Sequence, residues 1–557
     1  MASFPDEEEE FSQELMNEKD NDLSDEDTEE EEESSDSEES SDEDERSENI
    51  ANESNILYGK DNSIWFNQPQ KVKQRLPLFK QTNSEVVNPL VPTHSIKSTF
   101  EWFLTDEIIE KIVDATNQRG KFDHGEAWKD TDDVEILAWL GLHLRAGVNK
   151  DNHRPVSELF ASKTGPPIYG ATMPRDRFTL LKESIRFDDL NTRTERKSKE
   201  KQGKLAPIEE IFNLFIENCK LNYSPGDNIT VDETIVAFNG KCSFKVYMPS
   251  KPDKHGIKIW SCCDSKSSYL LNAKIYKGKE LDKKETGQAE RVVKDLVYML
   301  RDTGTNVTMD NFFTSIKLSK DLLDNGLSIL GTIRKNKKEI PPSFQASRNR
   351  VAHSTEFAFS KESRLMLCSY VPRKNKSVIM ISSKHYEKEI EEGPRHKPEI
   401  IAEYNRTKSG VDTLDQLVKT YSCKRVTNRW PLAIFYYMVD VAAYNSSVCF
   451  MNKNPHLYIG SQKRRKYLMD LSESLVMPLI QRRASSANFQ RLHKDTKSKI
   501  EAFVPISTIR EPIQSNNPRK RCSKCPREKG KKTKRICSRC SAPVCESHSK
   551  YICTDCD

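Results

Sequence analysis

The sequence has few hydrophobic residues and no long apolar run, and these absences limit the classes of protein that it can encode. Only 35% of its 557 residues are hydrophobic, whereas 31% are charged. Because no stretch of about 18 apolar residues occurs, the sequence predicts no membrane-spanning helix. The first residues, Met1 to Glu7, have neither a basic start nor an apolar stretch, so no secretory signal is expected. We expect a reducing compartment, in which the 14 cysteines form no disulfide framework.

Acidic residues are outnumbered by basic ones after residue 50, because the two signs of charge are segregated along the chain. Residues 1–50 hold 25 Asp and Glu against Lys19 and Arg46, a net charge of −23. The rest of the chain holds 86 basic and 60 acidic residues, a net charge of +26. Such an excess favours nucleic acid as a partner, since each neutralised phosphate releases counterions. A solvated basic surface is the alternative that the composition leaves open.

The first part of the chain that resembles a folded protein is predicted to be helical, from about Pro89 to Cys219. Thr105-Asp106-Glu107 and Thr131-Asp132-Asp133 have the composition of helix starts, and apolar residues at helical spacing follow each of them. Another helix is expected after Pro174. This helical block carries no catalytic pattern of its own.

A different pattern begins near Ile229, where strands and helices alternate. The predicted order is three strands, a helix, a strand, a helix and a strand, which is the order of a ribonuclease-H-like fold. One more helix is needed to complete such a site, and the segment from Ser409 to Leu417 supplies it. The predicted elements are strands at 229–232, 257–263 and 269–276, a helix at 289–300, a strand at 307–310, a helix at 318–324 and a strand at 327–333.

Three aspartates occupy positions in this pattern that suit two-metal phosphoryl transfer. Asp232 and Asp310 are predicted at strand ends, and Asp412 near the start of the closing helix. This chemistry needs hard oxygen ligands from several elements, so that two Mg²⁺ ions flank the scissile phosphate. Asp415 follows on the same helix face and is a candidate fourth carboxylate. The structural alternative is that strand-end aspartates cap the turns that follow them.

Five sequence blocks around these aspartates resemble the blocks of piggyBac transposases and come in the order of that family. They are Asn228 to Glu233, Met248 to Ile259, Asp310 to Ser315, Gly331 to Lys337 and Tyr404 to Gln416. Three shorter matches extend the resemblance from about residue 95 to the C-terminus: Asp151-Asn152-His153, Arg175 to Phe178, and Thr427-Asn428-Arg429-Trp430-Pro431.

The resemblance implies a cut-and-paste DNA transposase that acts on double-stranded DNA as a homodimer. Asp232, Asp310 and Asp412 would be its catalytic residues and would bind Mg²⁺ or Mn²⁺, with Asp415 as an adjunct. Water would attack the transposon end, the freed 3′ hydroxyl would form a hairpin, and the reopened ends would join a TTAA target. No covalent protein intermediate is needed, so the lack of a recognisable nucleophile constellation is no objection.

Composition and resemblance together predict a multidomain α/β protein. The acidic N-terminal region has too few apolar residues to fold, and it either restrains the basic body as a nucleic-acid mimic or phosphorylated tail, or solubilises the chain. The predicted regions are a disordered acidic segment at 1–88, a split helical dimerisation and DNA-binding domain at 89–226 and 421–504, a split ribonuclease-H-like core at 227–335 and 401–420, an inserted β-rich subdomain at 336–400, a linker at 505–519 and a cysteine-rich cross-brace zinc module at 520–557.

Basic and aromatic residues near the predicted site are candidates for DNA contacts. Lysine and arginine contact phosphates, and an aromatic ring stacks on or wedges an unpaired base. The alternatives are a solvated edge strand for the basic runs and a buried structural role for the tryptophan. The candidates are Lys251, Lys254, Lys258, Arg334, Lys335, Lys337, Lys338, Arg429 and Trp430.

Half of the cysteines fall in the last 36 residues, where they form close pairs with the spacing of zinc ligands. We expect two structural Zn²⁺ ions, because so short a segment cannot build a core without metal. The spacing allows sequential or interleaved pairing, and the family resemblance favours the interleaved one. Interleaved pairing places Cys522, Cys525, Cys545 and His548 on one ion, and Cys537, Cys540, Cys553 and Cys556 on the other.

Two other functional classes compete with the transposase. A domesticated DNA-binding or chromatin protein with an inactive core is disfavoured by the three retained aspartates. A ubiquitin ligase built on the zinc module leaves the large body of the chain unexplained. The basic runs at 519–521, 529–535 and 463–466 are predicted nuclear-import signals, so the expected location is the nucleus.

Overall fold

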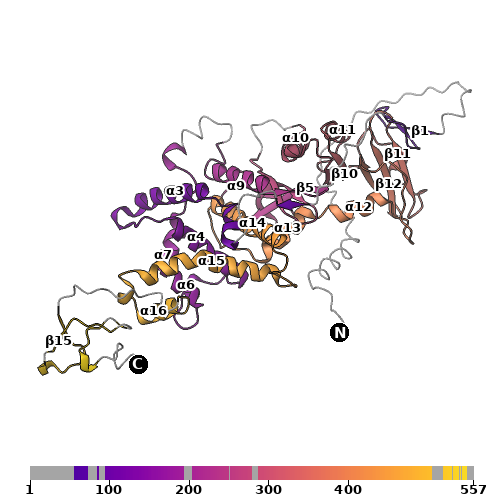
Figure 1. Cartoon of the computed structure of the whole chain (residues 1–557). Coiled ribbons are helices and arrows are strands. Elements are labelled where there is room, and N and C mark those ends of the chain that lie inside the picture. The colour runs from indigo at the N-terminus through magenta and orange to yellow at the C-terminus, as the bar shows by residue number, and fades with distance from the viewer. Residues whose placement is uncertain are drawn as a thin grey trace, which may run out of the picture. The chain divides into compact units, whose positions relative to one another are not determined.

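The chain divides into two compact units in the computed structural model (Figure 1). Of the described residues, unit 1 comprises those up to 108, those in 191–422 and those in 426–467, and unit 2 comprises those in 109–190, 423–425 and from 468 onward. Among the residues that the structure describes, no helix is both long and apolar enough to cross a membrane. The described residues are 55–72, 84–86, 95–193, 203–249, 251, 253–278, 286–504, 519–529, 531–537, 540 and 542–548.

Unit 1 contains one large sheet with helices on both faces. Its strands are β1 (Ile56–Tyr58), β2 (Ile64–Phe66), β3 (Glu85–Val86), β4 (Tyr223–Ser224), β5 (Asn228–Ala237), β6 (Val246–Tyr247), β7 (His255–Asp264), β8 (Leu270–Ile275), β9 (Asn306–Met309), β10 (Ser328–Thr332), β11 (Thr355–Phe359), β12 (Met366–Arg373) and β13 (Lys376–Ser382). Its helices are α2 (Ile96–Glu101), α9 (Glu209–Asn222), α10 (Gln288–Val297), α11 (Ile316–Asp324), α12 (Glu399–Thr407), α13 (Gly410–Thr420) and α14 (Trp430–Lys453).

The large sheet contains all of these strands except β3 and β4, eleven in all, and its strand pairing is mixed. Ten strands follow the order β1-β2-β11-β12-β13-β10-β9-β5-β7-β6, and β8 pairs with β7 outside this path. The central strands β5, β9 and β10 run parallel, whereas the other paired neighbours in this sheet run antiparallel. All four residues of β9 are buried, as expected for a parallel strand with covered faces. The alternating order of strands and helices predicted from Ile229 to Ile333 is confirmed.

Helices α10 and α11 cover one face of the sheet, and α12 and α13 cover the other (Figure 1). The apolar face predicted for 289–300 is confirmed in α10, where Val292, Val293, Leu296 and Val297 are buried. Helix α13 is the predicted closing helix, and Asp412 lies in its first turn. Helix α13, which carries the third candidate aspartate, therefore packs against β5, which carries the first.

Helices α9 and α14 pack with this sheet in unit 1, although the sequence assigned them to the split helical domain at 89–226 and 421–504. Asn445 of α14 is fully buried, and its side chain accepts a hydrogen bond from the Leu270 N–H at 3.1 Å and donates one to the Leu270 carbonyl at 3.0 Å. The Tyr269 hydroxyl donates to the carbonyl of Cys219 in α9 at 2.9 Å. These contacts join both helices to β8, and a linear pattern does not reveal them.

The prediction that residues 1–88 are disordered is wrong for part of that region, because β1, β2 and β3 lie within it. Trp65 of β2 is buried, and its indole N–H donates to the Glu339 carbonyl at 2.9 Å. Phe66 pairs with Phe359 of β11. β2 is thus stabilised by partners almost 300 residues away, so its own composition gives no local signal. Residues 1–54 lie outside the described residues.

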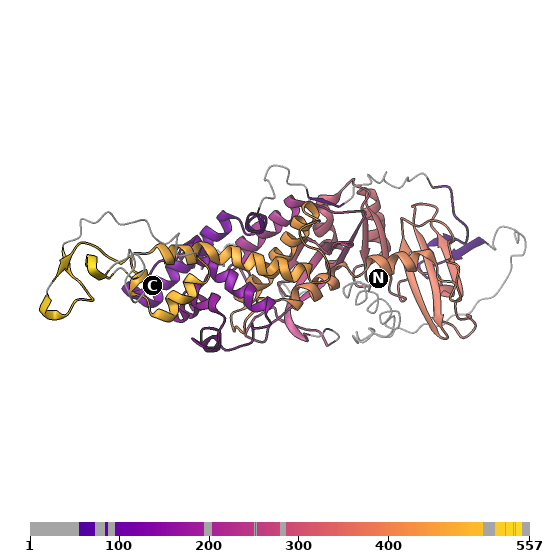
Figure 2. The same ribbon diagram turned by 60° about the horizontal axis from the view of Figure 1, so that its bottom comes forward.

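The strands of the predicted insertion at 336–400 continue the central sheet and do not form a separate one. β13 pairs antiparallel with β10, so that Leu330 lies opposite Ser382. Figure 2 shows the indigo strands β1 and β2 beside the salmon strands β11 to β13, which form the far end of the sheet. The β-rich character predicted for this segment is confirmed, and the structure adds that it extends the sheet of the core.

Unit 2 is mainly helical and has its core around α4. Asp132 caps α4 at the predicted start by accepting a hydrogen bond from the Glu135 N–H at 2.9 Å. Trp139 and His143 of α4 pack against the ring of Phe178. The elements that lie mostly or wholly in unit 2 are α3 (Asp106–His124), α4 (Asp133–Val148), α5 (Val156–Leu159), α6 (Pro167–Thr172), α7 (Arg175–Ser184), α15 (Lys463–Ser485), α16 (Lys494–Glu501), β14 (Lys520–Arg521) and β15 (Lys532–Thr533).

Candidate functional site

The two strand aspartates lie side by side because β5 and β9 are adjacent and parallel. Their register pairs Val231 with Met309, and the next residues of the chain are Asp232, which is still in β5, and Asp310, which directly follows β9. The prediction that Asp232 ends its strand is wrong, because β5 continues to Ala237. Beyond Val231, β5 pairs with β7 but no longer with β9, since β9 ends at Met309. Asp232 therefore lies where the parallel pairing ends.

Backbone groups hold both strand carboxylates in place. Asp310 Oδ1 accepts hydrogen bonds from the N–H groups of Phe312 at 3.0 Å and Phe313 at 3.4 Å. Asp232 Oδ1 accepts one from the Glu233 N–H at 2.7 Å. Backbone hydrogen bonds to Oδ1 thus orient both carboxylates.

Asp412 reaches the site because α13 begins very close to β5. A Cβ atom built on Gly410 would lie 2.5 Å from Thr230 Oγ1, closer than non-bonded atoms approach, so glycine is required for this contact. Gly410 is the first residue of α13, and Asp412 follows two positions later. The Gly410-Val411-Asp412 sequence therefore combines the close approach and the carboxylate in one helical turn.

Burial and mutual repulsion perturb the carboxylates of this cluster. Removal from water raises the pKa of Asp232 well above its usual range, and the neighbouring charge of Glu233 raises it further. The same two causes raise the pKa of Asp310 to about 6, against the backbone hydrogen bonds that lower it. Such perturbed carboxylates, gathered at one point, are typical of functional sites. Glu233 was not predicted as a site residue, and its position directly after Asp232 was the signal available.

Lys251 places its ammonium group among these carboxylates. Its Nζ lies 3.8 Å from Asp412 Oδ1 and 4.0 Å from Glu233 Oε1. Burial alone would lower the pKa of Lys251, but the charges of Asp232, Asp412 and Glu233 raise it above its usual range. The sequence predicted Lys251 as a DNA contact, and the structure places it against the acidic cluster.

Asp415 lies one turn after Asp412 and contacts a different partner. Its Oδ1 accepts a hydrogen bond from Thr234 Oγ1 at 2.9 Å. Burial of the carboxylate raises the pKa of Asp415 to about 7, although the Thr234 hydroxyl lowers it. Asp415 therefore joins α13 to β5 beside the cluster that contains Asp232, Asp310 and Asp412.

The cluster fits divalent cations in its chemistry. Its donors are carboxylate oxygens, the ligands that Mg²⁺ and Mn²⁺ prefer, and the Lys251 ammonium stands in for a cation beside Asp412. In the described part of the chain, one set of His, Cys, Asp or Glu side chains has all its ligand atoms within 4.8 Å of one another, and it lies at the C-terminus. The oxygens of the three aspartates are therefore more widely spaced than the ligand atoms of that set. Wider spacing suits two ions about 3.5–4 Å apart.

The tight C-terminal set consists of Cys522, Cys525, Cys545 and His548, whose ligand atoms all lie within 4.8 Å of one another and could hold a metal ion. Cys545 Sγ lies 3.2 Å from His548 Nδ1 and 3.6 Å from Cys525 Sγ. These four residues are one set of the interleaved pairing. Of the other set, Cys537 is buried and Cys540 exposed, while Cys553 and Cys556 lie outside the described residues.

The predicted DNA-contact residues occupy several places in unit 1. Lys254 is exposed, and Lys258 on β7 has its ammonium 4.4 Å from the centre of the Trp260 ring. Arg334, Lys337 and Lys338 line one polar hollow of unit 1, and Lys335 beside them is exposed. This basic loop is contacted by β2 through the hydrogen bond from Trp65 to Glu339.

Trp430 and Arg429 lie at the start of α14. Trp430 is half-buried and makes an edge-to-face contact with Phe244 at 5.1 Å between ring centres. Arg429 precedes the helix, and its backbone N–H donates to Thr427 Oγ1 at 3.1 Å. Of the basic run at 463–466, Arg464 is buried and lies 4.9 Å from the centre of the Tyr421 ring. That run is folded into α15, which weakens its interpretation as an import signal.

Comparisons with known proteins agree with this geometry. A family model described as Transposase IS4 matches residues 97–447. The human PiggyBac transposable element-derived protein 2 is 21% identical over 371 residues, 62% of this chain and 60% of that protein. The human PiggyBac transposable element-derived protein 3 is 24% identical over 352 residues, 59% of this chain and 57% of that protein. The chain thus spans less than two thirds of the length of either relative.

A solved structure gives a longer match. The cryo-EM structure of a piggyBac transposase synaptic complex with hairpin DNA superposes with a TM-score of 0.71 at 32% sequence identity. The match covers 86% of this chain and all of that chain. Fold, family model and sequence identity agree, and the chain belongs to the piggyBac transposase family.

Proposed function

We propose that this chain is a DNA transposase that excises an element by metal-dependent strand cleavage and hairpin formation, and integrates it at TTAA sites. The observation that carries the proposal is the convergence of Asp232 and Asp310, from adjacent parallel strands, with Asp412 from the helix that covers them. We further propose that β5, β7, β8, β9 and β10 with their helices are a ribonuclease-H-like core.

In this proposal Asp232, Asp310 and Asp412 hold Mg²⁺ or Mn²⁺. When bound, the ions supply activation of the attacking oxygen and stabilisation of the charge on the leaving oxygen. The carboxylates would hold these ions where they can bind the scissile phosphate, and each step exchanges one P–O bond for another. The first attack, by water, frees a 3′ hydroxyl. This hydroxyl attacks the opposite strand to give a hairpin, which is reopened before the ends join the target.

The basic residues of unit 1 are proposed to hold the DNA backbone near this cluster. Lys254, Lys258, the exposed loop residues Arg334, Lys335 and Lys338, and the half-buried Lys337 are the proposed phosphate contacts. Lys251 is proposed to reach the phosphate nearest the aspartates, since its ammonium already lies among them. Arg429 and Trp430 are proposed to contact the DNA from the start of α14.

The C-terminal quartet is proposed to bind a structural Zn²⁺, because three cysteines and one histidine with no open position are typical of such sites. A second Zn²⁺ is proposed on the other four cysteines. The basic residues around this module favour binding of transposon-end DNA, and the same residues favour a location in the nucleus. Assembly as a homodimer completes the proposal.

The alternative function is a DNA-binding or chromatin protein that no longer transposes. The observation that favours it is that two relatives of this chain are human transposable element-derived proteins. The two functions differ in one outcome, because the alternative predicts binding of terminal-repeat DNA without strand cleavage.

The test is excision of a plasmid-borne element with candidate terminal repeats flanked by TTAA, in Mg²⁺, by the full chain. We expect Asp310→Asn to reduce excision more than about 100-fold, because even the outer partners of metal ligands are worth 10–100-fold. Asp264→Asn is the matched control. Asp264 is a buried aspartate at the end of β7 that accepts hydrogen bonds from Gly226 and Ser267, away from the cluster, so excision should survive. DNA binding without cleavage by the parent chain would establish the alternative.

A further inference from the structure

Three buried threonines precede the three aspartates of the cluster in the sequence. On β5 and on β9, a threonine precedes the aspartate by two positions, as Thr230 and Thr308. Because side chains alternate along a strand, Thr230 projects from the same face as Asp232, and Thr308 lies two positions before Asp310, which directly follows β9. The register places Thr230 beside Thr308. The third threonine, Thr407, is the last residue of α12, just before the helix that carries Asp412.

The three threonines are joined by short hydrogen bonds. Thr308 Oγ1 donates to Thr407 Oγ1 at 2.9 Å, and Thr407 Oγ1 donates to the Glu403 carbonyl at 2.9 Å. Thr230 Oγ1 donates to the carbonyl of Thr407 at 2.6 Å. Thr407 therefore contacts both strands at once, through its side chain to β9 and through its backbone to β5.

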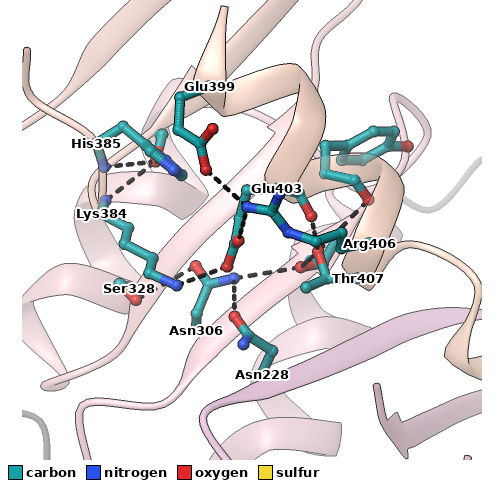
Figure 3. Close-up of polar contacts among 12 residues, drawn as sticks. Asn228, Asn306, Ser328, Lys384, His385, Glu399, Glu403, Arg406 and Thr407 are labelled. Carbon is teal, nitrogen blue, oxygen red and sulfur yellow. Dashed lines mark hydrogen bonds and ion pairs between the residues drawn. The ribbon is translucent and has the colours of Figure 1, made fainter. Parts of the chain in front are cut away.

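The network continues sideways through the three parallel strands. Asn306 of β9 donates to Asn228 Oδ1 at 3.1 Å and to Thr308 Oγ1 at 3.2 Å. It accepts a hydrogen bond from Ser328 of β10 at 3.3 Å. Figure 3 shows Asn306 between Ser328 and Asn228. The donors and acceptors run from β10 through β9 to α12, with a side branch in which Asn306 of β9 donates to Asn228 of β5.

A second contact, through Glu403, holds α12 to the segment that follows β13. Lys384, which follows β13, donates to Glu403 Oε1 at 2.7 Å, and Arg406 donates to Glu403 Oε2 at 2.7 Å. Figure 3 shows the side chains of Lys384 and Arg406 meeting at Glu403. Helix α12 is thus held to the sheet at two places, and the threonines form the place next to the aspartates.

Burial makes this threonine network sensitive to small changes. Thr308 is 0% exposed, Thr230 1% and Thr407 5%. A buried hydroxyl that loses its partner retains its desolvation cost, so one arrangement of the network is strongly preferred. Gly410 adds a steric limit on the same side, because a Cβ there would meet Thr230 Oγ1 at 2.5 Å. The corner between α12 and α13 therefore has little freedom to move relative to β5 and β9.

We propose that Thr230, Thr308 and Thr407 are positioning residues that set the place of Asp412 relative to Asp232 and Asp310. They touch neither substrate nor metal, and they act through the three aspartates. The inference rests on the proposed metal site. The competing explanation is that these hydroxyls merely stabilise the fold, as buried polar groups do elsewhere in the chain. The two explanations differ in whether cation affinity changes when the protein remains folded.

The test measures binding of Mn²⁺ alone to the full chain by loss of the free-ion EPR signal, with Asp310→Asn as the reference for binding outside the cluster. Thr308→Val keeps the volume and removes the hydroxyl. We expect it to raise the Kd for Mn²⁺ about tenfold, the lower end of the effect of outer-shell partners. Thr308→Ser restores the hydroxyl and is expected to restore most of the affinity. Circular dichroism melts confirm that each variant is folded at the temperature of the titration.

Thr172→Val is the matched control. Thr172 is equally buried on α6 in unit 2, and its hydroxyl donates to the carbonyl four residues earlier, Ile168, at 2.7 Å, as Thr407 does to Glu403. This control should leave the Kd for Mn²⁺ unchanged. A folded Thr308→Val with the parent affinity overturns the inference, and so does an equal loss of affinity in Thr172→Val. If the parent binds no more Mn²⁺ than Asp310→Asn, the metal site of the proposed function fails, and this inference fails with it.

Discussion

Lys251 carries a positive charge into the acidic cluster, where burial opposes the charge and the surrounding carboxylates favour it. Its ammonium lies within 4.0 Å of oxygens from both Asp412 and Glu233. The repulsion between carboxylates that would otherwise face one another is thereby reduced when no metal is bound. A divalent cation bound at the same place would neutralise the same carboxylates. We therefore expect the cation to replace the stabilising effect of the Lys251 ammonium.

The first prediction concerns Lys251→Met, which keeps the side-chain stem and removes the charge. In EDTA we expect the free energy of unfolding to fall by about 1–3 kcal/mol, because the remaining carboxylates lose a charged partner. In excess MgCl₂ the loss should shrink, since the cation replaces the ammonium. Urea unfolding in both buffers measures this, with the exposed neighbour Lys254→Met as the control. An equal loss in both buffers would contradict this replacement.

A second residue, His143, couples the stability of unit 2 to pH. It is fully buried on α4, and its Nδ1 lies 3.3 Å from the Cys423 carbonyl. Burial, with a smaller contribution from the charge of Arg425, lowers the pKa of His143 to about 3. In the unfolded chain the histidine has a pKa near 6.5. The folded state therefore excludes a proton that the unfolded state binds between these two values.

The free energy of unfolding that His143 contributes therefore rises with pH between these two values. The contribution of His143 to stability is complete above about pH 6.5 and is lost as the pH falls towards 3, by up to about 1.4 kcal/mol per pH unit. The variant His143→Gln stays neutral and can still donate to Cys423. Urea unfolding from about pH 7.5 to about pH 5 should show a shallower acid loss for His143→Gln than for the parent. Parallel curves would show that His143 does not control this part of the pH dependence.

At the scale of elements, the site depends on how closely α13 approaches β5. In Gly410→Ala, alanine improves helix propensity by about 1 kcal/mol, but its Cβ would lie 2.5 Å from Thr230 Oγ1. Overpacking costs about 1–3 kcal/mol, so we expect a net loss of stability and a displaced Asp412. Thermal unfolding and the excision assay together measure this.

Gly170→Ala in α6 is the control for Gly410→Ala. A Cβ at Gly170 would meet Lys499 Cδ at 3.0 Å, and the flexible lysine side chain can move aside. This variant should keep the excision activity and most of the stability of the parent. If Gly410→Ala behaves in the same way, the close approach of α13 to β5 is not what places Asp412.

The sequence predicted elements well where a pattern is local. Helix α10 has four buried aliphatic residues at helical spacing, and its bounds were predicted closely. Helix α14 is buried on nearly every side, so it has no polar face that would assign it to one domain. β2 depends on the distant partners Glu339 and Phe359. Its strand character is therefore decided by tertiary pairing and not by local composition.

In the candidate site, too, the residues with a local sequence signal were predicted and those that depend on tertiary contacts were not. Asp232, Asp310 and Asp412 could be found from motif and spacing, because each stands in a distinctive sequence block. Lys251 was found as a basic residue, but its pairing with the acidic cluster depends on the return of β7 beside β5. Thr407 could not be found, because its partners are on β5 and β9 and threonine near a helix end is common.

At the scale of the whole molecule, the C-terminal module raises the question of how its metal ligands are paired. Cys522 and Cys525 lie beside Cys545 and His548, although about 20 residues separate the two pairs. This arrangement requires the intervening segment, with Cys537 and Cys540, to loop out and find other partners. Cys553 and Cys556 are the remaining candidates. Each ion would then join both halves of the module, and loss of one ligand would affect one ion alone.

Double variants of the full chain distinguish the two pairings by zinc content. If pairing is interleaved, Cys525 and Cys545 share an ion, so Cys525→Ser with Cys545→Ser should lose one Zn²⁺ per chain, measured by mass spectrometry of the metal. Cys525→Ser with Cys540→Ser should lose two, because these residues then hold different ions. Sequential pairing predicts the reverse, two ions lost in the first variant and one in the second. Since zinc modules of this size unfold without metal, the variant that loses both ions should also become sensitive to protease in this segment.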